Sequence, residues 1–309
     1  MFFKETLNGT ASWGNIFTSI EAFAPLAKAI FQKEGLTVKE EIQNLTPGTN
    51  AVFKADRLVI KIYAPRESGF HTEQDYYTEL SVMKFAMEQG ISVPRIIAYG
   101  ELKDKYLFRY IVMDYVVANV PLDTVLSFPE TDKKQFVMRL SEITSRLNQP
   151  FDHLPPQPDL RNHPYRTERM NGLHPSLIQE LEIRASERNY SGKVLVHGDI
   201  TRDNVLLDSQ GTLTLIDFAD CMIAPEDYEL PAIIFELFLG DAELVSAFLE
   251  IKGADKEEFL EELINGLSIH LFCGNILKDN LNRLGIPFTS VKNMDELKQL
   301  LRMQLFNSK

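Results

Sequence analysis

The chain has 309 residues, of which 44% are hydrophobic and 25% charged, and 44 acidic residues against 32 lysines and arginines give a net charge of −12. This composition excludes a collagenous, low-complexity or disordered chain, and the acidic balance argues against nucleic acid as a partner. No stretch approaches the roughly 18 apolar residues of a membrane span, the first residues show no secretory signal, and two cysteines cannot form a disulfide framework. We therefore expect a soluble, cytoplasmic protein that binds neither membranes nor nucleic acid.

The first third of the chain is expected to be mostly β-structure. Apolar residues recur at helical spacing between residues 13 and 34, and Pro25 within this stretch predicts a kink or a break into two short helices. After Gly35, four runs rich in β-branched and aromatic residues predict strands at Ala51–Lys54, Leu58–Tyr63, Ile96–Glu101 and Leu107–Tyr115. A helix is expected over Glu73–Gln89, and Gly90 would end it.

Helical patterns dominate from Pro121 onward. Helices are expected at Thr131–Gln149, Tyr228–Gly240, Ala242–Ile251, Lys256–Leu284 and Asp295–Phe306. Thr131 or Asp132 could cap the first of them, and the proline-rich stretch Pro150–Pro164 is expected to be a surface loop. Two β-like runs, Lys193–Val196 and Thr212–Ile216, interrupt the helices.

These patterns predict an α+β protein with two lobes. The small β-rich lobe would span residues 1–117, of which residues 1–43 form a helical extension, and the larger helical lobe would span residues 118–309. The crossover is expected near Val116–Pro121.

The segment Val194–Cys221 carries most of the chemical information. A strand leads into His197-Gly198-Asp199, Asn204 follows five residues later, and a hairpin then ends at Asp217. The hairpin predicts that Asp199, Asn204 and Asp217 lie together at one end of its strands. Two carboxylates and an amide oxygen suit Mg²⁺ with its phosphate ligands, and a carboxylate left free of metal can accept a proton from a hydroxyl. The alternative is a hairpin whose polar ends are simply solvated.

The sequence HGDITRDN followed by IDFAD resembles the H-G-D-x-x-x-x-N and I-D-[FW] signatures of the aminoglycoside phosphotransferase and choline kinase family. These small-molecule kinases share the two-lobed protein-kinase fold. The resemblance implies that Asp199 is the catalytic base, that Asn204 and Asp217 hold Mg²⁺, and that His197 supports the loop. It also implies ATP or GTP as the phosphate donor. Protein kinases themselves usually carry Arg at the position of Gly198.

Lys61 is a second candidate, because it lies inside the apolar run Val59–Ile62. A buried lysine needs a partner, and the resemblance pairs Lys61 with the nucleotide phosphates and with a helical glutamate. Glu79 is preferred to Glu73 for that role, because its position relative to the apolar face of the helix points it inward. The alternative is a lysine on an edge strand that faces solvent.

The phosphate loop and the hinge are the least distinct parts of the pattern. No G-x-G-x-x-G motif is present, but Leu45–Val52 supplies Gly48, Thr49 and Asn50, and backbone N–H groups of such a turn can hold phosphate. The alternative is an ordinary hairpin turn with Thr46-Pro47-Gly48 at its centre. In the hinge, backbone groups of Asp114 and Val116 would bind the purine.

The acceptor is expected to bind in the helical lobe. Acidic residues gather between Asp241 and Glu262 and favour a cationic partner, although such runs are often only a solvated helix face. Glu229 stands where the family usually has an Asp that anchors the catalytic loop, and we assign it a structural role.

The sequence thus predicts an Mg²⁺-dependent phosphotransferase that acts on a hydroxyl of a small, amine-bearing molecule. An aminoglycoside-type antibiotic is the first candidate. The alternatives are a metabolic kinase of choline, homoserine, fructosamine or a sugar, and a catalytically silent protein that only binds nucleotide.

Overall fold

The computed structural model describes residues 1–46, 48–70, 72–161 and 163–306. Pro47, in the expected phosphate loop, therefore lies outside the described residues. The chain divides into two compact units, one of Met1–Val117 with Ile216–Ala219 and one of Ala118–Leu215 with the residues from Asp220 onward. Within the described ranges, no helix is long and apolar enough to cross a membrane.

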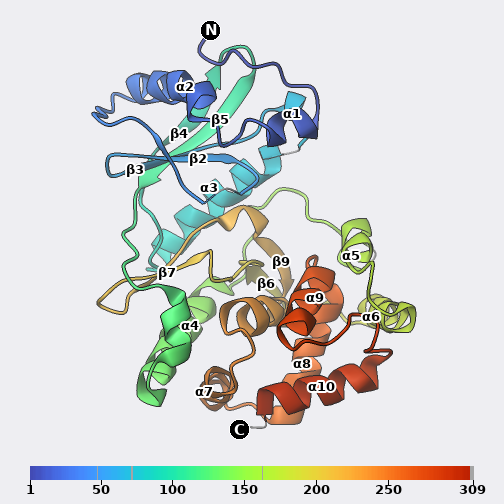
Figure 1. The fold of residues 1–309 in the computed structure, drawn as a ribbon. Helices are drawn as coiled ribbons and strands as arrows, with labels where there is room; N and C mark the ends of the chain where they lie inside the picture. Colours follow the sequence, from blue (N-terminus) through green and yellow to red (C-terminus); the bar gives the residue numbers. More distant parts are fainter. Residues whose placement is uncertain (47, 71, 162, 307–309) are drawn as a thin grey trace. The chain divides into compact units, whose positions relative to one another are not determined.

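The first unit is built on a five-stranded antiparallel sheet with the strand order β1-β2-β3-β5-β4 (Figure 1). The strands are β1 Gln43–Asn44, β2 Ala51–Ala55, β3 Leu58–Ile62, β4 Ile96–Lys103 and β5 Leu107–Asp114. Four of them were predicted; β1 has only two residues, too few to show a pattern. Helix α3, Thr72–Glu88, agrees with the predicted helix to within a residue at each end.

Side chains alternate across β3, so its two faces meet different helices. Ile60 and Ile62 join the hydrophobic core that also contains buried residues of α2, Ile20–Lys33. Lys61 points to the other face, where it contacts α3. The sheet is therefore covered by α2 on one face and by α3 on the other.

The break expected at Pro25 is not there. Helix α2 runs through Pro25, and the interruption lies upstream, between α1, Thr10–Gly14, and Ser19. The Ser19 hydroxyl accepts a hydrogen bond from the Ala22 N–H and begins the helix at that point. Burial of the apolar face of α2, with Phe23 fully inside the core, offsets the backbone hydrogen bond that a proline forfeits.

The second unit is mainly helical. Its helices are α4 Glu130–Leu147, α5 Pro164–Arg169, α6 Pro175–Glu187, α7 Ala242–Lys252, α8 Lys256–Ile269, α9 Cys273–Arg283 and α10 Met294–Phe306. Together the two units confirm the predicted α+β class.

Several predicted helix boundaries in this unit are wrong. Helix α4 begins after Pro129, so Thr131 and Asp132 lie in its first turn and neither is its N-cap. The expected helix over 256–284 is two helices, separated at His270, whose buried ring stacks on Tyr228. The expected helix over 228–240 is a 3₁₀ turn at Glu226–Glu229 followed by a π-helix, Ala232–Leu237. Helices α5 and α6 were not predicted.

Two small antiparallel ladders position the loop that holds the HGDITRDN sequence. Strand β6, Lys193–Val196, pairs with β9, Met222–Pro225, and leads directly into that loop. Strand β7, Val205–Leu207, leaves the loop and forms a hairpin with β8, Leu213–Leu215. The loop is thus held at both ends by a strand.

Candidate functional site

Lys61 forms the centre of a charged cluster in the first unit. Its ammonium nitrogen lies 2.7 Å from Glu79 Oε2 on α3 and 2.7 Å from Asp217 Oδ1. The side chains of Lys61 and Glu79 are 7% and 2% exposed, whereas that of Asp217 is 43% exposed. Glu73, the competing candidate, pairs with Arg109 instead. The structure therefore brings together Lys61, Glu79 and Asp217, three of the residues that the sequence singled out.

Tyr63 belongs to the same cluster and was missed. Its hydroxyl donates a hydrogen bond to Glu79 Oε2. Because Tyr63 follows Lys61 by two residues, strand alternation points both side chains to the same face. That spacing was a signal available in the sequence.

The charges of the cluster keep Lys61 protonated. Burial by itself would lower the pKa of Lys61, but the carboxylates of Asp217 and Glu79 outweigh this effect and raise it. Burial, together with the neighbouring Glu79, also raises the pKa of Tyr63, so its phenol stays a hydrogen-bond donor. The cluster therefore holds one buried ammonium between two carboxylates, of which Asp217 is the exposed one.

Asp217 has a left-handed backbone conformation, with φ of 59°. This region is costly for a residue with a side chain and is concentrated at functional sites. The conformation falls just after the end of β8, where the chain turns into the short 3₁₀ segment Phe218–Asp220.

Asp199 and Asn204 are hydrogen-bonded to each other within the HGDITRDN loop of the second unit. The Asn204 side-chain amide donates to Asp199 Oδ2 at 2.6 Å and to the Asp199 carbonyl at 3.0 Å. Both bonds use the amide nitrogen of Asn204, so its amide oxygen is the atom with the chemistry to bind a cation. His197 is fully buried, and its Nδ1 accepts a hydrogen bond from the Asp199 N–H at 3.3 Å.

Glu229 anchors the start of this loop, as predicted. One of its carboxylate oxygens accepts the His197 N–H, and the other accepts the Gly198 N–H at 3.2 Å. The side chain is buried. A carboxylate has two oxygens that can accept two parallel N–H groups, which fixes the backbone immediately before Asp199.

The burial of Glu229 gives the fold a pH dependence with a defined sign. Burial raises the pKa of Glu229 from its ordinary value of 4.5 to about 7, although the His197 and Gly198 N–H groups oppose the shift. Between these values the folded protein binds a proton that the unfolded chain has released. The stabilising contribution is therefore complete below pH 4.5 and is lost as the pH rises through 7.

We expect the unfolding free energy of the wild type to fall, between pH 5 and pH 8, by about 2 kcal/mol more than that of Glu229→Gln. Urea unfolding of both proteins at four pH values measures this difference. Parallel pH profiles would contradict the role assigned to the buried carboxylate.

Gly198 is required by its conformation and by its surroundings. Its φ is 79°, and a Cβ at this position would lie 2.9 Å from the carbonyl oxygen of Asp220. We expect Gly198→Ala to destabilise the second unit by roughly 2 kcal/mol or more, through the left-handed conformation and the clash together. Gly192→Ala is the matched control, because Gly192 also has positive φ but has open space around its Cβ position. Equal urea midpoints for the two variants would contradict the clash.

The expected phosphate loop and hinge have local roles in the first unit. The side chain of Asn50 is buried and accepts the Ala64 N–H at 3.2 Å, and the Thr49 carbonyl accepts the Trp13 indole N–H at 2.9 Å. Gly48 has open space around its Cβ position and is not held in a left-handed conformation. The Asn50 side chain is therefore used by the fold, and a cradle for phosphate at Gly48, Thr49 and Asn50 would depend on backbone groups and the exposed Thr49.

In the hinge, the Asp114 N–H donates to the Arg95 carbonyl at 3.0 Å, and the Asp114 carboxylate pairs with the Arg95 side chain. A contact between this hinge and a purine would therefore use the Asp114 carbonyl and the backbone of Val116.

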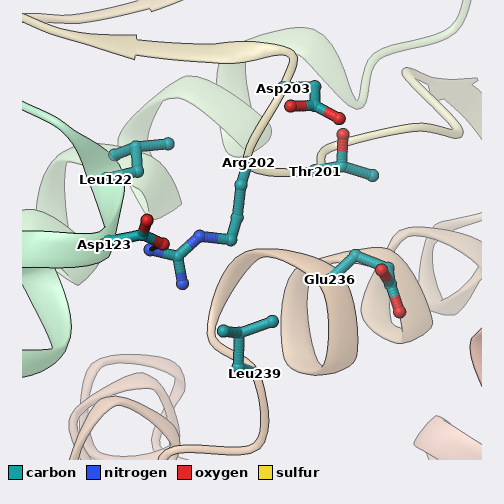
Figure 2. Close-up of a pocket in the computed structure, with 7 residues that line it drawn as sticks. All are labelled: Leu122, Asp123, Thr201, Arg202, Asp203, Glu236 and Leu239. Carbon is teal, nitrogen blue, oxygen red and sulfur yellow. Dashed lines mark ion pairs between the residues drawn. The ribbon is translucent and has the colours of Figure 1, made fainter. Parts of the chain in front are cut away.

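A pocket of about 360 Å³ lies beside the catalytic loop in the second unit. It is lined by Leu122, Asp123, Thr201, Arg202, Asp203, Glu236 and Leu239 (Figure 2). Residues 201–203 stand between Asp199 and Asn204 in the sequence, so the pocket is lined in part by the loop that carries both candidates. Glu236 belongs to the π-helix, a rare element that is frequent at functional sites. The sequence did not indicate Glu236, and Arg202 was visible only as a variable position of the loop motif.

The acidic run between residues 241 and 262 is largely used by the fold. Asp241 and Asp255 cap helices α7 and α8. Most of the other carboxylates form ion pairs: Glu243 with Lys133, Glu250 with Lys134, Glu257 with Arg302, and Glu261 with Arg184 and Lys298. This acidic run therefore gives little support to the expected cationic acceptor.

Comparison with known families and structures agrees with this fold. A model of the phosphotransferase enzyme family matches residues 48–263. The GDP complex of aminoglycoside 2′-phosphotransferase-IIIa is 17% identical, with 90% of this chain and 97% of that chain covered and a TM-score of 0.59. A choline/ethanolamine kinase family protein from Mesorhizobium loti is 14% identical, with 90% and 99% covered and a TM-score of 0.57.

A third similar structure is a thermostable mutant of aminoglycoside phosphotransferase APH(4)-Ia in ternary complex with ADP and hygromycin B. It is 17% identical, with 89% of this chain and 97% of that chain covered and a TM-score of 0.55. A search of curated protein sequences found no match.

Proposed function

Because this chain belongs to the phosphotransferase enzyme family, we propose that it moves the γ-phosphate of ATP or GTP to a hydroxyl of a small, amine-bearing molecule, with Mg²⁺ as cofactor. The observation that carries the proposal is the Lys61 ammonium held at 2.7 Å by both Glu79 and Asp217. A strand lysine paired with a helix glutamate, beside an aspartate suited to Mg²⁺, is the arrangement that kinases use to bind a triphosphate.

Phosphoryl transfer requires positioning and charge neutralisation more than covalent chemistry. In the proposed mechanism Lys61 binds the α- and β-phosphates, and Glu79 and Tyr63 hold it in place. Asp199 orients the acceptor hydroxyl and accepts its proton, and Glu229 and His197 keep the loop in the required conformation.

The residues proposed to hold Mg²⁺ offer oxygen ligands, which are the ligands that this ion prefers. Asp217 offers an exposed carboxylate, and Asn204 offers an amide oxygen. Within the described ranges, no group of three or more His, Cys, Asp or Glu side chains could hold a metal by itself. That agrees with an ion bound by one or two protein oxygens and by substrate phosphates. When bound, Mg²⁺ would neutralise charge on the phosphates.

Two classes of acceptor have support. An aminoglycoside-type antibiotic is favoured by the similar structures, of which one is a kanamycin complex and another contains hygromycin B. A metabolic hydroxy amine is favoured by the similarity to the choline/ethanolamine kinase family protein. A catalytically silent protein is disfavoured, because Lys61, Asp199, Asn204 and Asp217 are all present.

A coupled assay of ADP or GDP release tests the proposal. Mg²⁺–ATP and Mg²⁺–GTP would be offered with kanamycin, hygromycin B, choline, ethanolamine and homoserine, and Asp199→Ala would be the blank. We expect release that depends on one acceptor and is lost in the blank. No release with any acceptor, together with no nucleotide-induced rise in melting temperature, would overturn the proposal.

A further inference from the structure

The pocket beside the catalytic loop contains both signs of charge. Asp123, Asp203 and Glu236 contribute carboxylates, and Arg202 contributes a guanidinium (Figure 2). A purely cationic acceptor would need only the carboxylates. The arginine therefore calls for a separate explanation.

Arg202 lies on the catalytic loop, three residues after Asp199, and its side chain extends toward Asp123 (Figure 2). The Arg202 side chain is 16% exposed, and its Nη2 pairs with Asp123 Oδ1 at 2.8 Å. Asp123 is 89% exposed, so this pair is of the solvated kind that contributes little. Nη1 is buried and has no hydrogen-bond partner among the residues that the structure describes. Arg202 is therefore held by Asp123, while the N–H groups of its Nη1 make no hydrogen bond within the described residues.

Among the described residues, Glu236 lacks a hydrogen-bond donor, whereas Arg202 lacks an acceptor. Glu236 Oε1 is buried and accepts no hydrogen bond from the described part of the chain, and the Arg283 guanidinium stands 3.6 Å away. A carboxylate in that state is stabilised by an incoming donor with a positive charge. The pocket thus contains a guanidinium nitrogen on Arg202 that makes no hydrogen bond within the described residues, and a carboxylate oxygen on Glu236 that has only the 3.6 Å ion pair with Arg283.

We propose that the acceptor of this enzyme is a hydroxy amino acid type of molecule, whose carboxylate is bound by Arg202 and whose ammonium is bound by Glu236. The inference rests on the proposed function and names the acceptor class of that same site. A guanidinium binds a carboxylate through two parallel hydrogen bonds. A dianionic phosphate would fit less well, because Asp123 and Asp203 line the same pocket and would repel it more strongly than a single charge.

Matched pairs of acceptors that differ only in the carboxylate test this proposal. Homoserine is compared with 3-aminopropan-1-ol, serine with ethanolamine, and threonine with 1-aminopropan-2-ol, and kanamycin serves as an amine without a carboxylate. Binding in the presence of Mg²⁺–ADP is measured by calorimetry, and turnover by ADP release. We expect at least one amino acid to bind roughly tenfold to a hundredfold more tightly than its partner.

Two variants separate the two contacts. Arg202→Gln is expected to abolish the preference, because it should weaken binding of the amino acid far more than binding of the amino alcohol. Glu236→Gln is expected to weaken both members of a pair by a similar factor. Arg202→Lys keeps the charge but loses the planar fork, and it should retain part of the preference if Arg202→Gln fails to fold. Arg302→Gln removes an equal charge from a surface pair with Glu257 and should change nothing.

The results distinguish this inference from the function on which it rests. Turnover of kanamycin or choline, together with no turnover of any amino acid in the panel, would overturn the inference and keep the phosphotransferase. A panel in which no amino acid binds more tightly than its amino alcohol would also overturn it. Absence of nucleotide binding and of all turnover would instead remove the proposed function.

Discussion

Asp199→Asn is expected to lower kcat by about 10²–10⁴-fold, the usual contribution of a positioned general base. The Asp199 carboxylate accepts the Asn204 amide at 2.6 Å through Oδ2, and in the proposed mechanism it also receives the proton of the acceptor hydroxyl. An amide at position 199 cannot accept the proton that this hydroxyl must lose. The affinity for nucleotide is expected to stay near that of the wild type, because Lys61 belongs to a separate cluster.

Single-turnover rates and nucleotide affinity, measured on the same preparation, check this expectation. Asp152→Asn is the matched control, since it makes the same change at an exposed position of the proline-rich loop. A variant at position 199 that transfers phosphate at the wild-type rate would remove Asp199 from the mechanism. An equal loss of kcat in the Asp152 control would show that the loss comes from removing a negative charge anywhere on the protein, and not from position 199.

The contact between Asp199 and Asn204 could be predicted from the sequence, because its geometry is local. Asp199 and Asn204 are five residues apart between two short strands, and the strands were readable from their apolar runs. Lys61 and Glu79 were also predictable, since strand and helix periodicity each fix the direction of a side chain. The fold class followed from the same periodicities and from the family resemblance.

The remaining features depend on contacts that periodicity does not encode. Pro25 was expected to kink the helix or to break it into two; the break does not occur, and the burial of Phe23 favours a continuous α2. The interruption at His270 reflects the stacking of its ring on Tyr228, from a distant part of the chain. Arg202 and Glu236 meet in one pocket only because the catalytic loop packs beside a π-helix. Each of these outcomes was decided by tertiary packing rather than by local propensity.

Lys61→Met is expected to lower the unfolding free energy of the first unit by about 3–5 kcal/mol, the usual cost of removing one partner from a buried ion pair. Without the ammonium, the buried Glu79 carboxylate keeps only the hydrogen bond from the Tyr63 hydroxyl among the contacts described here. Burial already raises the pKa of Glu79, and Lys61 opposes that shift. Loss of Lys61 therefore favours the protonated acid, so the destabilisation should be larger at pH 8 than at pH 5.

The double variant Lys61→Met/Glu79→Gln resolves the cause of that loss. If the uncompensated charge of Glu79 dominates, the double variant should recover a large part of the stability that Lys61→Met loses, while nucleotide binding stays impaired in both. Lys28→Met, at an exposed position of α2, controls for the substitution itself. If the double variant loses as much unfolding free energy as the two single variants together, Lys61 and Glu79 are not energetically coupled. The 2.7 Å pair would then contribute packing but no charge compensation. If the double variant recovers stability but not nucleotide affinity, the loss of affinity cannot be due to unfolding. It would then be due to the missing Lys61 ammonium, which would be assigned to the triphosphate.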